Sequence, residues 1–290
     1  MDAHVDEVLD RVVAWGRGRP DVVAMILTSS RARDDGRADE LSDHDVIVAV
    51  DDPASFAASL DWQVELGTPV TRWGDEAEVD GYTTVFRGVI YDDGAKLDLT
   101  FWPRELLSHV ATNGSFMPEL DMGYRVLFDD DGATARWPAP TFRAFVPARP
   151  SADDYRALVE LFWWDVSYAA KALHRGEVVF AKSFMFEHEM RLEVLTEVLG
   201  WLIEVRNDWS LPLGTYGRQL DHHLPPDLRE AFLRTYVGPS TEENWDALDG
   251  LCALFRQAAT EVGAALGYPY PAHVDRWMTA HMTALRERTR

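Results

Sequence analysis

The chain has 290 residues, 47% of them hydrophobic and 11% aromatic, which is enough to bury the cores of two modest domains. Its 49 acidic and 28 basic residues give a formal net charge of -21, which would repel nucleic acid and attract a small polycation, although such a surface can also serve solubility alone. The single cysteine cannot form an intramolecular disulfide, the acidic N-terminus does not resemble a signal peptide, and no apolar run is long enough to cross a bilayer. We therefore expect a cytoplasmic protein that contacts neither membrane nor nucleic acid, and no feature points to an obligate protein partner.

The first half of the chain alternates helical and strand patterns. Apolar residues recur at helical spacing over residues 5–13, and an apolar run typical of a buried strand follows over Val22–Leu27. A second strand is predicted over Asp45–Val50. Two further runs, Thr83–Tyr91 and Lys96–Trp102, are separated by an Asp-Asp-Gly turn, so we expect them to form a hairpin.

The second half carries long helical periodicities and no convincing strand. Pro147 and Pro150 interrupt the pattern, so we place a domain boundary between residues 1–149 and residues 150–290. The predicted fold class is α+β, with a sheet-containing domain followed by an all-α helical bundle. Helices are expected over Ala152–Arg175, Val178–Val205, Pro226–Tyr236, Thr241–Leu266 and Ala272–Arg288.

Three acidic residues stand where strands are predicted. Because side chains alternate between the two faces of a strand, Asp43 and Asp45 point to one face and His44 to the other. Two neighbouring carboxylates repel each other by about 1 kcal/mol in water and about 4 kcal/mol at an intermediate dielectric, so a cation is expected between them. Asp98 lies inside a predicted strand, where an acid is unusual unless it faces a site. Each acid alone is typical of a solvated turn or strand face, but together they predict a site for one or two Mg²⁺ ions, which prefer oxygen ligands completed by substrate phosphates.

The turn after the first strand supplies groups suited to a triphosphate. Ser29, Ser30 and Arg31 follow the strand directly, and we expect their backbone N–H groups and a hydroxyl to cradle the phosphates while Arg31 offsets phosphate charge. The order of strand, Ser-Arg turn, Asp-x-Asp strand and later strand Asp is far more specific than any one of its parts.

This order resembles the Gly-Ser-x, Asp-x-Asp, Asp signature of the minimal nucleotidyltransferases. Beyond the signature, LDLTFWP, ELFWWDVSYAAKALHRGEVVFAK, RLEVLTEVLGW, LGTYGRQLDHHLP and LGYPYP are similar to segments of the streptomycin-modifying aminoglycoside 6-adenylyltransferases, and the similarity covers nearly the whole chain. Ser29 replaces the family's glycine, and its side chain is expected to crowd the phosphates. The resemblance implies an N-terminal nucleotidyltransferase domain with a mixed sheet and flanking helices, a C-terminal helical substrate-binding domain, metal ligation by Asp43, Asp45 and Asp98, and triphosphate contacts from Ser30 and Arg31.

Two cations in the helical half are candidates for contacts with nucleotide phosphate. Trp164, Tyr168, Lys171 and Arg175 share one helix face at i, i+4, i+7 and i+11 spacing. The chain has only three lysines, and the resemblance implies a nucleotide-phosphate role for Lys171, although a lysine there can also simply extend into solvent. Arg218 follows a Gly-rich turn and is a further candidate phosphate contact, although such turns are usually plain loops.

A streptomycin-like acceptor carries guanidinium groups, which bind carboxylates and flat aromatic rings. Glu160, Trp163, Trp164 and Asp165 offer both kinds of group and are the candidate acceptor-binding residues, although adjacent tryptophans often serve packing instead. Further acids on the next helix are candidates of the same kind or a solvated face, namely Glu187, Glu189 and Glu193.

Together these features predict Mg²⁺-dependent transfer of AMP from ATP to a hydroxyl of an aminoglycoside, with streptomycin as the first candidate and Asp98 as the first candidate base. Transfer to another small cationic acceptor, to water or to a protein side chain stays open, as does a catalytically silent nucleotide-binding module. A kinase acting on the same antibiotics is disfavoured, because Val50 stands where a kinase catalytic loop has Asn and no Gly-Lys pair is present.

Overall fold

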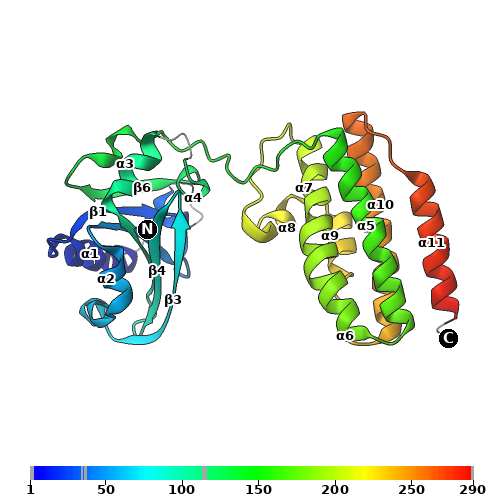
Figure 1. Ribbon diagram of the computed structural model, residues 1–290, viewed down its shortest axis with the longest axis horizontal. Coiled ribbons are helices and arrows are strands. Elements are labelled where there is room, and N and C mark those ends of the chain that lie inside the picture. Colours follow the sequence, from blue (N-terminus) through cyan, green and yellow to red (C-terminus); the bar gives the residue numbers. More distant parts are fainter. Residues whose placement is uncertain (1–2, 34, 36–37, 113–115, 289–290) are drawn as a thin grey trace. The chain divides into compact units, whose positions relative to one another are not determined.

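The computed structural model describes residues 3–33, 35, 38–112 and 116–288, without the side chains of residues 3–6 and 184–187. The chain divides into two compact units, Met1–Ala144 and Phe145–Arg290. This division falls a few residues before the boundary that the prolines led us to expect. Each unit has its own elements and core, so each is described by itself (Figure 1). In the part of the chain that the structure describes, no helix is both long and apolar enough to cross a membrane.

The first unit, called the sheet unit below, is built on one mixed sheet. Neighbouring strands in this sheet are antiparallel, except that β2 and β5 form a parallel pair in the middle. The strand order is β3-β4-β5-β2-β1-β6. The strands are β1 (Val22–Thr28), β2 (His44–Val50), β3 (Pro69–Val79), β4 (Tyr82–Tyr91), β5 (Lys96–Pro103) and β6 (Tyr124–Asp129).

The four strands predicted from the sequence are confirmed, including the β4–β5 hairpin, but β3 and β6 were missed. Both missed strands lie at the edges of the sheet. β3 is exposed along nearly its whole length, so its sequence lacks the alternation of apolar and polar residues that marks a half-buried strand. β6 likewise buries few of its side chains.

Helices cover both faces of this sheet. On one face, α1 (Ala3–Arg17) and α2 (Pro53–Ala58) pack against β-strand residues such as Val48 and Phe101. On the other face, α3 (Arg104–Thr112) and the short α4 (Pro118–Asp121) pack against Ile47, Ala49 and Trp102. The connecting 3-10 helices are η1 (Ser30–Ala32), η2 (Asp61–Leu66) and η3 (Ala133–Arg136).

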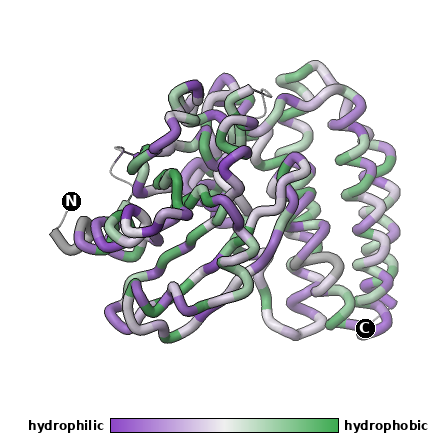
Figure 2. The backbone as a smooth tube through the Cα atoms, turned by 60° about the vertical axis from the view of Figure 1, so that its left-hand side comes forward, coloured by the Kyte–Doolittle hydropathy of each residue, from purple (hydrophilic) through white to green (hydrophobic). Residues whose placement is uncertain are grey.

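The second unit, called the helical unit below, contains helices and no strand among its described residues, so the predicted α+β fold class is confirmed. Its long helices alternate hydrophilic and hydrophobic residues, as helices with one buried face do (Figure 2). The expected helix over Val178–Val205 is helical throughout, but its middle section is a π-helix. The elements are α5 (Ala152–His174), α6 (Val178–Ala181), the π-helix η4 (Lys182–Leu195), α7 (Thr196–Val205), η5 (Thr215–Gly217), α8 (Leu220–His223), α9 (Pro226–Leu233), α10 (Thr241–Leu266) and α11 (Ala272–Glu287).

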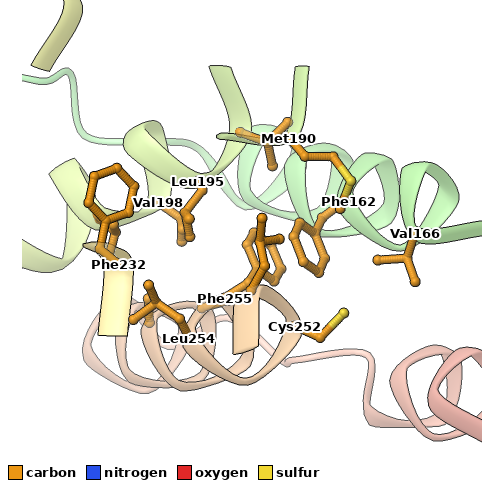
Figure 3. Packing of buried hydrophobic residues seen from close by; sticks show 14 of the residues in the cluster. Phe162, Val166, Met190, Leu195, Val198, Phe232, Cys252, Leu254 and Phe255 are labelled. Atoms are coloured by element: carbon orange, nitrogen blue, oxygen red, sulfur yellow. The ribbon is translucent and has the colours of Figure 1, made fainter. Parts of the chain in front are cut away.

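The core of the helical unit lies between α5, η4, α7 and α10. The rings of Phe162 on α5 and Phe255 on α10 stack with centroids 3.6 Å apart, and Met190, Leu195 and Val198 pack beside them (Figure 3). Burying a side chain of this size stabilises the fold by roughly 1.5–3 kcal/mol. This core fixes the orientation of α5, the helix that carries most of the candidate residues of the helical unit.

Candidate active site

Two of the three predicted acids meet at the centre of the sheet. Asp45 and Asp98 are paired across the parallel strands β2 and β5, one residue from the start of β2 and two from the start of β5. Ile47 lies an even number of residues after Asp45 on β2, and Trp102 lies an even number of residues after Asp98 on β5, so each shares a face with its acid. Ile47 and Trp102 are buried against α3 and α4, so both acids point to the face that these helices cover. Both acids line a cavity of about 240 Å³ in the sheet unit, together with Ser29.

The third acid is joined to this pair by a lysine that the sequence analysis did not include. Nζ of Lys96 donates to Oδ2 of Asp43 at 2.6 Å and to Oδ2 of Asp98 at 2.8 Å. The side chain of Asp98 is only 14% exposed, whereas those of Lys96 and Asp43 are each 38% exposed. Asp45 and Asp98 are thus direct neighbours, whereas Asp43 is linked to Asp98 only through the ammonium group of Lys96.

The electrostatics show that these carboxylates are crowded. Burial, and next the charge of Asp98, raise the pKa of Asp45 to about 6, against a hydrogen bond from Ser29 that lowers it. Burial lowers the pKa of Lys96, but the hydrogen bonds to Asp43 and Asp98 outweigh burial, so this pKa is raised. The corner of the sheet thus carries more negative charge than its one lysine offsets, which favours binding of a further cation.

The surroundings of Asp98 also suit a metal ligand. Its Oδ1 is buried and has no hydrogen-bond partner among the described residues. Gly88 pairs with Asp98 across β4 and β5, and a Cβ at Gly88 would come within 3.0 Å of that oxygen. The glycine therefore leaves room around an acceptor atom that no group among the described residues uses.

The donor set consists of carboxylate oxygens, which is what Mg²⁺ requires. As their side chains stand, however, no three His, Cys, Asp or Glu residues in the described part of the chain converge closely enough to hold a metal ion. Lys96 lies between two of the candidate ligands. The oxygens of Asp43, Asp45 and Asp98 therefore suit Mg²⁺ in their chemistry, but with Lys96 between two of them they do not form a ready metal site.

The residue that replaces the family glycine adopts a glycine-like backbone. Ser29 has φ 60° and ψ -149°, a region that L-residues occupy at a cost of about 1–3 kcal/mol. Its hydroxyl is used, because it hydrogen-bonds to the carboxylate of Asp45. The crowding of phosphates by Ser29 stays a prediction, and the structure adds that its side chain holds one of the acids.

The other two residues of the turn lie beside this corner. Ser30 begins η1 and its carbonyl accepts a hydrogen bond from Arg33. The guanidinium of Arg31 donates to the carbonyls of Asp39, Ser42 and Asp43, including a 2.9 Å bond from Nε to Ser42. Arg31 therefore braces the loop that presents Asp43.

In the helical unit, the predicted shared face of α5 is confirmed. The rings of Trp164 and Tyr168 lie 6.0 Å apart, and Nζ of Lys171 lies 4.1 Å from the Tyr168 ring centroid. Tyr168, Lys171 and Arg175 line a cavity of about 230 Å³ with Phe180. Two cations and two aromatic rings are thus available there to an anionic, flat molecule.

Arg218 does not line the cavity of Lys171, so the structure does not unite these two candidate phosphate contacts. It is exposed and follows the turn at Gly214–Gly217, in which Tyr216 has φ 53°. Both lie in the helical unit, whereas Ser29, Ser30 and Arg31 lie in the sheet unit.

The candidate acceptor residues of α5 divide between two sides of the helix. Glu160 and Trp164 are exposed, with 63% of Trp164 accessible. Trp163 is completely buried and its indole donates to the Tyr270 hydroxyl at 3.1 Å, so it packs the core and offers no surface to an acceptor. Asp165 is 1% exposed.

The charge on Asp165 is poorly compensated. Its Oδ2 has no hydrogen-bond partner among the described residues. Burial, and next the charge of Glu189 on η4, raise the pKa of Asp165 to about 6. Of the other acids proposed on the helix after α5, Glu193 is exposed and lies beside His188. The side chain of Glu187 lies outside the described residues.

Lys96 and Gly88 are the site residues that sequence reasoning missed. Lys96 could have been predicted from strand alternation, because it lies two residues before Asp98 on the same strand and so shares its face. Gly88 has no such signal, since only the register of β4 on β5 places it beside Asp98.

Comparisons with known proteins identify the family of the chain. A family model described as streptomycin adenylyltransferase matches residues 3–285. An aminoglycoside 6-adenylyltransferase of Campylobacter jejuni is 25% identical over 274 residues, covering 93% of this chain and 92% of that protein. Another from Bacillus subtilis (strain 168) is 25% identical over 272 residues, covering 91% and 92%. A crystal structure of an aminoglycoside 6-adenyltransferase from Bacillus subtilis aligns over 97% of both chains at 22% identity, with a TM-score of 0.48. The resemblance noted in the sequence is confirmed, and the chain belongs to the streptomycin adenylyltransferase family, a family of adenylyl-transferring enzymes.

Proposed function

We propose that this chain transfers AMP from ATP to a hydroxyl of an aminoglycoside, with streptomycin as the first candidate acceptor and Mg²⁺ as the cofactor. The observation that carries the proposal is the pairing of Asp45 with Asp98 across two parallel strands, with Asp43 linked to Asp98 through one ammonium group, in a chain of this family. The names of the relatives supply the class of acceptor.

Asp43, Asp45 and Asp98 are the proposed ligands of one or two Mg²⁺ ions. Bound there, Mg²⁺ would neutralise phosphate charge and make the α-phosphorus more electrophilic. Ser29, Ser30 and Arg31 are the proposed contacts to the triphosphate from the sheet unit. From the helical unit, Lys171 and Arg218 are the proposed contacts, and the cavity shared by Lys171 and Arg175 supports Lys171 more strongly.

The reaction needs one proton acceptor. The acceptor hydroxyl oxygen bonds to the α-phosphorus, the bond from that phosphorus to the bridging oxygen breaks, and pyrophosphate leaves. The hydroxyl proton passes to a carboxylate, for which we propose Oδ1 of Asp98, because this oxygen is engaged by no other described group. Positioning of both substrates should contribute more to the rate than this proton transfer does.

For the acceptor we propose Glu160 and Trp164 as direct contacts, since both are exposed on one side of α5 and offer a carboxylate and an aromatic plane to a guanidinium group. Trp163 and Asp165 lie behind them in the core and would support this surface from within. The net charge of -21 would steer a cationic acceptor to the protein in the cytoplasm, where ATP is abundant, without selecting one antibiotic.

The test is incubation of the protein with ATP, Mg²⁺ and streptomycin, followed by mass spectrometry of the antibiotic. We expect a mass gain of one AMP and release of pyrophosphate, and neither product with Asp98→Asn. A panel of other aminoglycosides tests the runner-up, transfer to a different cationic acceptor. If ATP binds but no acceptor in the panel gains mass, the chain is a nucleotide-binding module and the proposed activity is wrong.

A further inference from the structure

The ammonium of Lys96 occupies the position of a counter-ion in the acidic corner of the sheet. It contacts Oδ2 of Asp43 at 2.6 Å and Oδ2 of Asp98 at 2.8 Å, both within the range of charge-assisted hydrogen bonds. Lys96 and Asp98 stand two residues apart on β5, so their side chains share one face of the strand. A divalent cation that bridges Asp43 and Asp98 through their Oδ2 atoms needs the oxygens that Lys96 contacts, even though Oδ1 of Asp98 stays open to it. Two cations so close together would also repel each other.

We infer that Lys96 is a positioning residue that competes with the divalent cation for Asp43 and Asp98, and thereby raises the metal concentration that the enzyme requires. The inference rests on the proposed function, in which these acids hold Mg²⁺. In the absence of metal, the ammonium holds the two carboxylates side by side and limits their repulsion. When metal binds, the ammonium has to leave.

The displaced ammonium has space beside the turn proposed to hold the triphosphate. Lys96 lines a cavity of about 520 Å³ with Arg31 of that turn, and also with the acids Asp39, Glu40 and Asp93, which would attract the ammonium as well. A lysine ammonium on its flexible four-carbon stem can exchange a carboxylate for a phosphate oxygen. Metal and nucleotide would then favour each other, because metal frees the lysine and phosphate accepts it.

The sheet unit contains a matched control at the opposite end of the same strands. Arg104 follows β5 and bridges Asp51, at 2.8 Å, and Asp131. Its side chain is 38% exposed, the same fraction as that of Lys96. Arg104 therefore carries the same charge and bridges two carboxylates, but it lies away from the acids proposed to bind metal.

The first experiment measures Mn²⁺ binding without nucleotide, by calorimetry and by the electron paramagnetic resonance signal of free Mn²⁺. Lys96→Met is expected to bind Mn²⁺ about 10-fold more tightly than the wild-type chain, a moderate gain because the pair is partly screened by solvent. Lys96→Arg and Arg104→Met are expected to match the wild type, because the first retains the charge and the second removes a charge elsewhere. Equal or weaker Mn²⁺ binding by folded Lys96→Met would overturn the inference, since a purely structural lysine gives no gain in affinity.

A second experiment needs no variant and so decides the matter even if Lys96→Met does not fold. The chain has only three lysines, so reductive methylation followed by peptide mass spectrometry follows each of them. Saturating Mn²⁺ is expected to increase methylation of Lys96 several-fold, because its ammonium is released from Asp43 and Asp98. Lys182 is an internal reference, since its Nζ donates to the carbonyl of Val237 at 2.8 Å and should be unaffected. Unchanged methylation of Lys96 in saturating Mn²⁺ would contradict displacement.

The same measurements separate this inference from the proposed function. If neither the wild-type chain nor Lys96→Met binds Mn²⁺, the assignment of the metal site itself is wrong. If the wild-type chain binds Mn²⁺, Asp98→Asn does not, and Lys96→Met binds no more tightly than wild type, the metal site stands and only the competition is refuted.

Discussion

Asp45 in the sheet unit and Asp165 in the helical unit are two carboxylates with the same electrostatic signature in different settings. For each, burial and then one neighbouring acid raise the pKa to about 6. Asp45 has Ser29 as a hydrogen-bond donor, lines a cavity and lies near a lysine. Asp165 is 1% exposed, and its Oδ2 has no partner among the described residues. The comparison teaches that a raised carboxyl pKa marks a candidate reaction site only where open space and a counter-ion accompany it.

The largest expected effect concerns the sheet unit. Asp45→Asn and Asp98→Asn preserve the shape of the side chains but remove the charge, so we expect kcat/KM for adenylyl transfer to fall by at least about 100-fold, as on loss of one preorganised electrostatic contact. Steady-state kinetics with ATP and the best acceptor measure this loss. Thermal denaturation is the control, because Asp45→Asn should melt no lower than wild type at neutral pH. A parallel loss of activity and stability would mean that these acids are structural.

The convergence of these acids is also where sequence reasoning reached furthest. Strand alternation placed Asp43 and Asp45 on one face, and Asp98 was chosen because an acid is unusual inside a strand. The parallel register of β2 and β5 is what brings Asp45 and Asp98 together. That register is a long-range property that no local pattern encodes. The same limit explains why Gly88 was missed, and why the edge strand β3, exposed on both faces, left no periodic signal.

On α5 the limit was different. Periodicity grouped Trp164 with Tyr168, which the structure confirms. It did not separate Trp164 from Trp163, because two adjacent tryptophans are both apolar and only the packing of Trp163 against neighbouring helices decides which is buried. Residue type was therefore enough to choose the candidate acceptor-binding residues, but only their burial in the structure shows which of them an acceptor can reach.

A smaller effect, on stability, tests the other half of the comparison. The folded-state pKa of Asp165, about 6, lies above the ordinary value of 3.8 for an aspartate. The free energy of unfolding therefore falls as pH rises between these values, and the penalty is complete above pH 6. Asp165→Asn removes this penalty and should stabilise the chain by up to about 3 kcal/mol above that pH, with the gain shrinking as pH falls towards 4. Urea denaturation across this pH range measures the difference.

Asp275 in the same unit serves as a control, because its pKa is shifted in the opposite direction from that of Asp165. Burial raises its pKa, but hydrogen bonds from Arg256 and Tyr270 outweigh burial and lower the pKa. Arg256 donates to both its carboxylate oxygens, at 2.6 and 2.7 Å. The stability from this pair is present above the unfolded pKa of Asp275 and is lost as pH falls, so Asp275→Asn should destabilise the chain at neutral pH. If Asp165→Asn and Asp275→Asn change the free energy of unfolding in the same direction, the lack of a counter-ion is not what makes Asp165 destabilising.

The smallest expected effect assigns the outer surface of α5. Trp164 and Trp277 on α11 are both 63% exposed, so they differ in location but not in accessibility. If the acceptor stacks a guanidinium group on Trp164, Trp164→Ala should raise the acceptor KM about 5-fold and leave the KM for ATP unchanged, the magnitude of an exposed cation–π contact. Trp277→Ala should change neither constant. If the two substitutions change the KM for the acceptor equally, the effect does not depend on the position of the tryptophan. The acceptor-binding site would then not include the exposed face of α5.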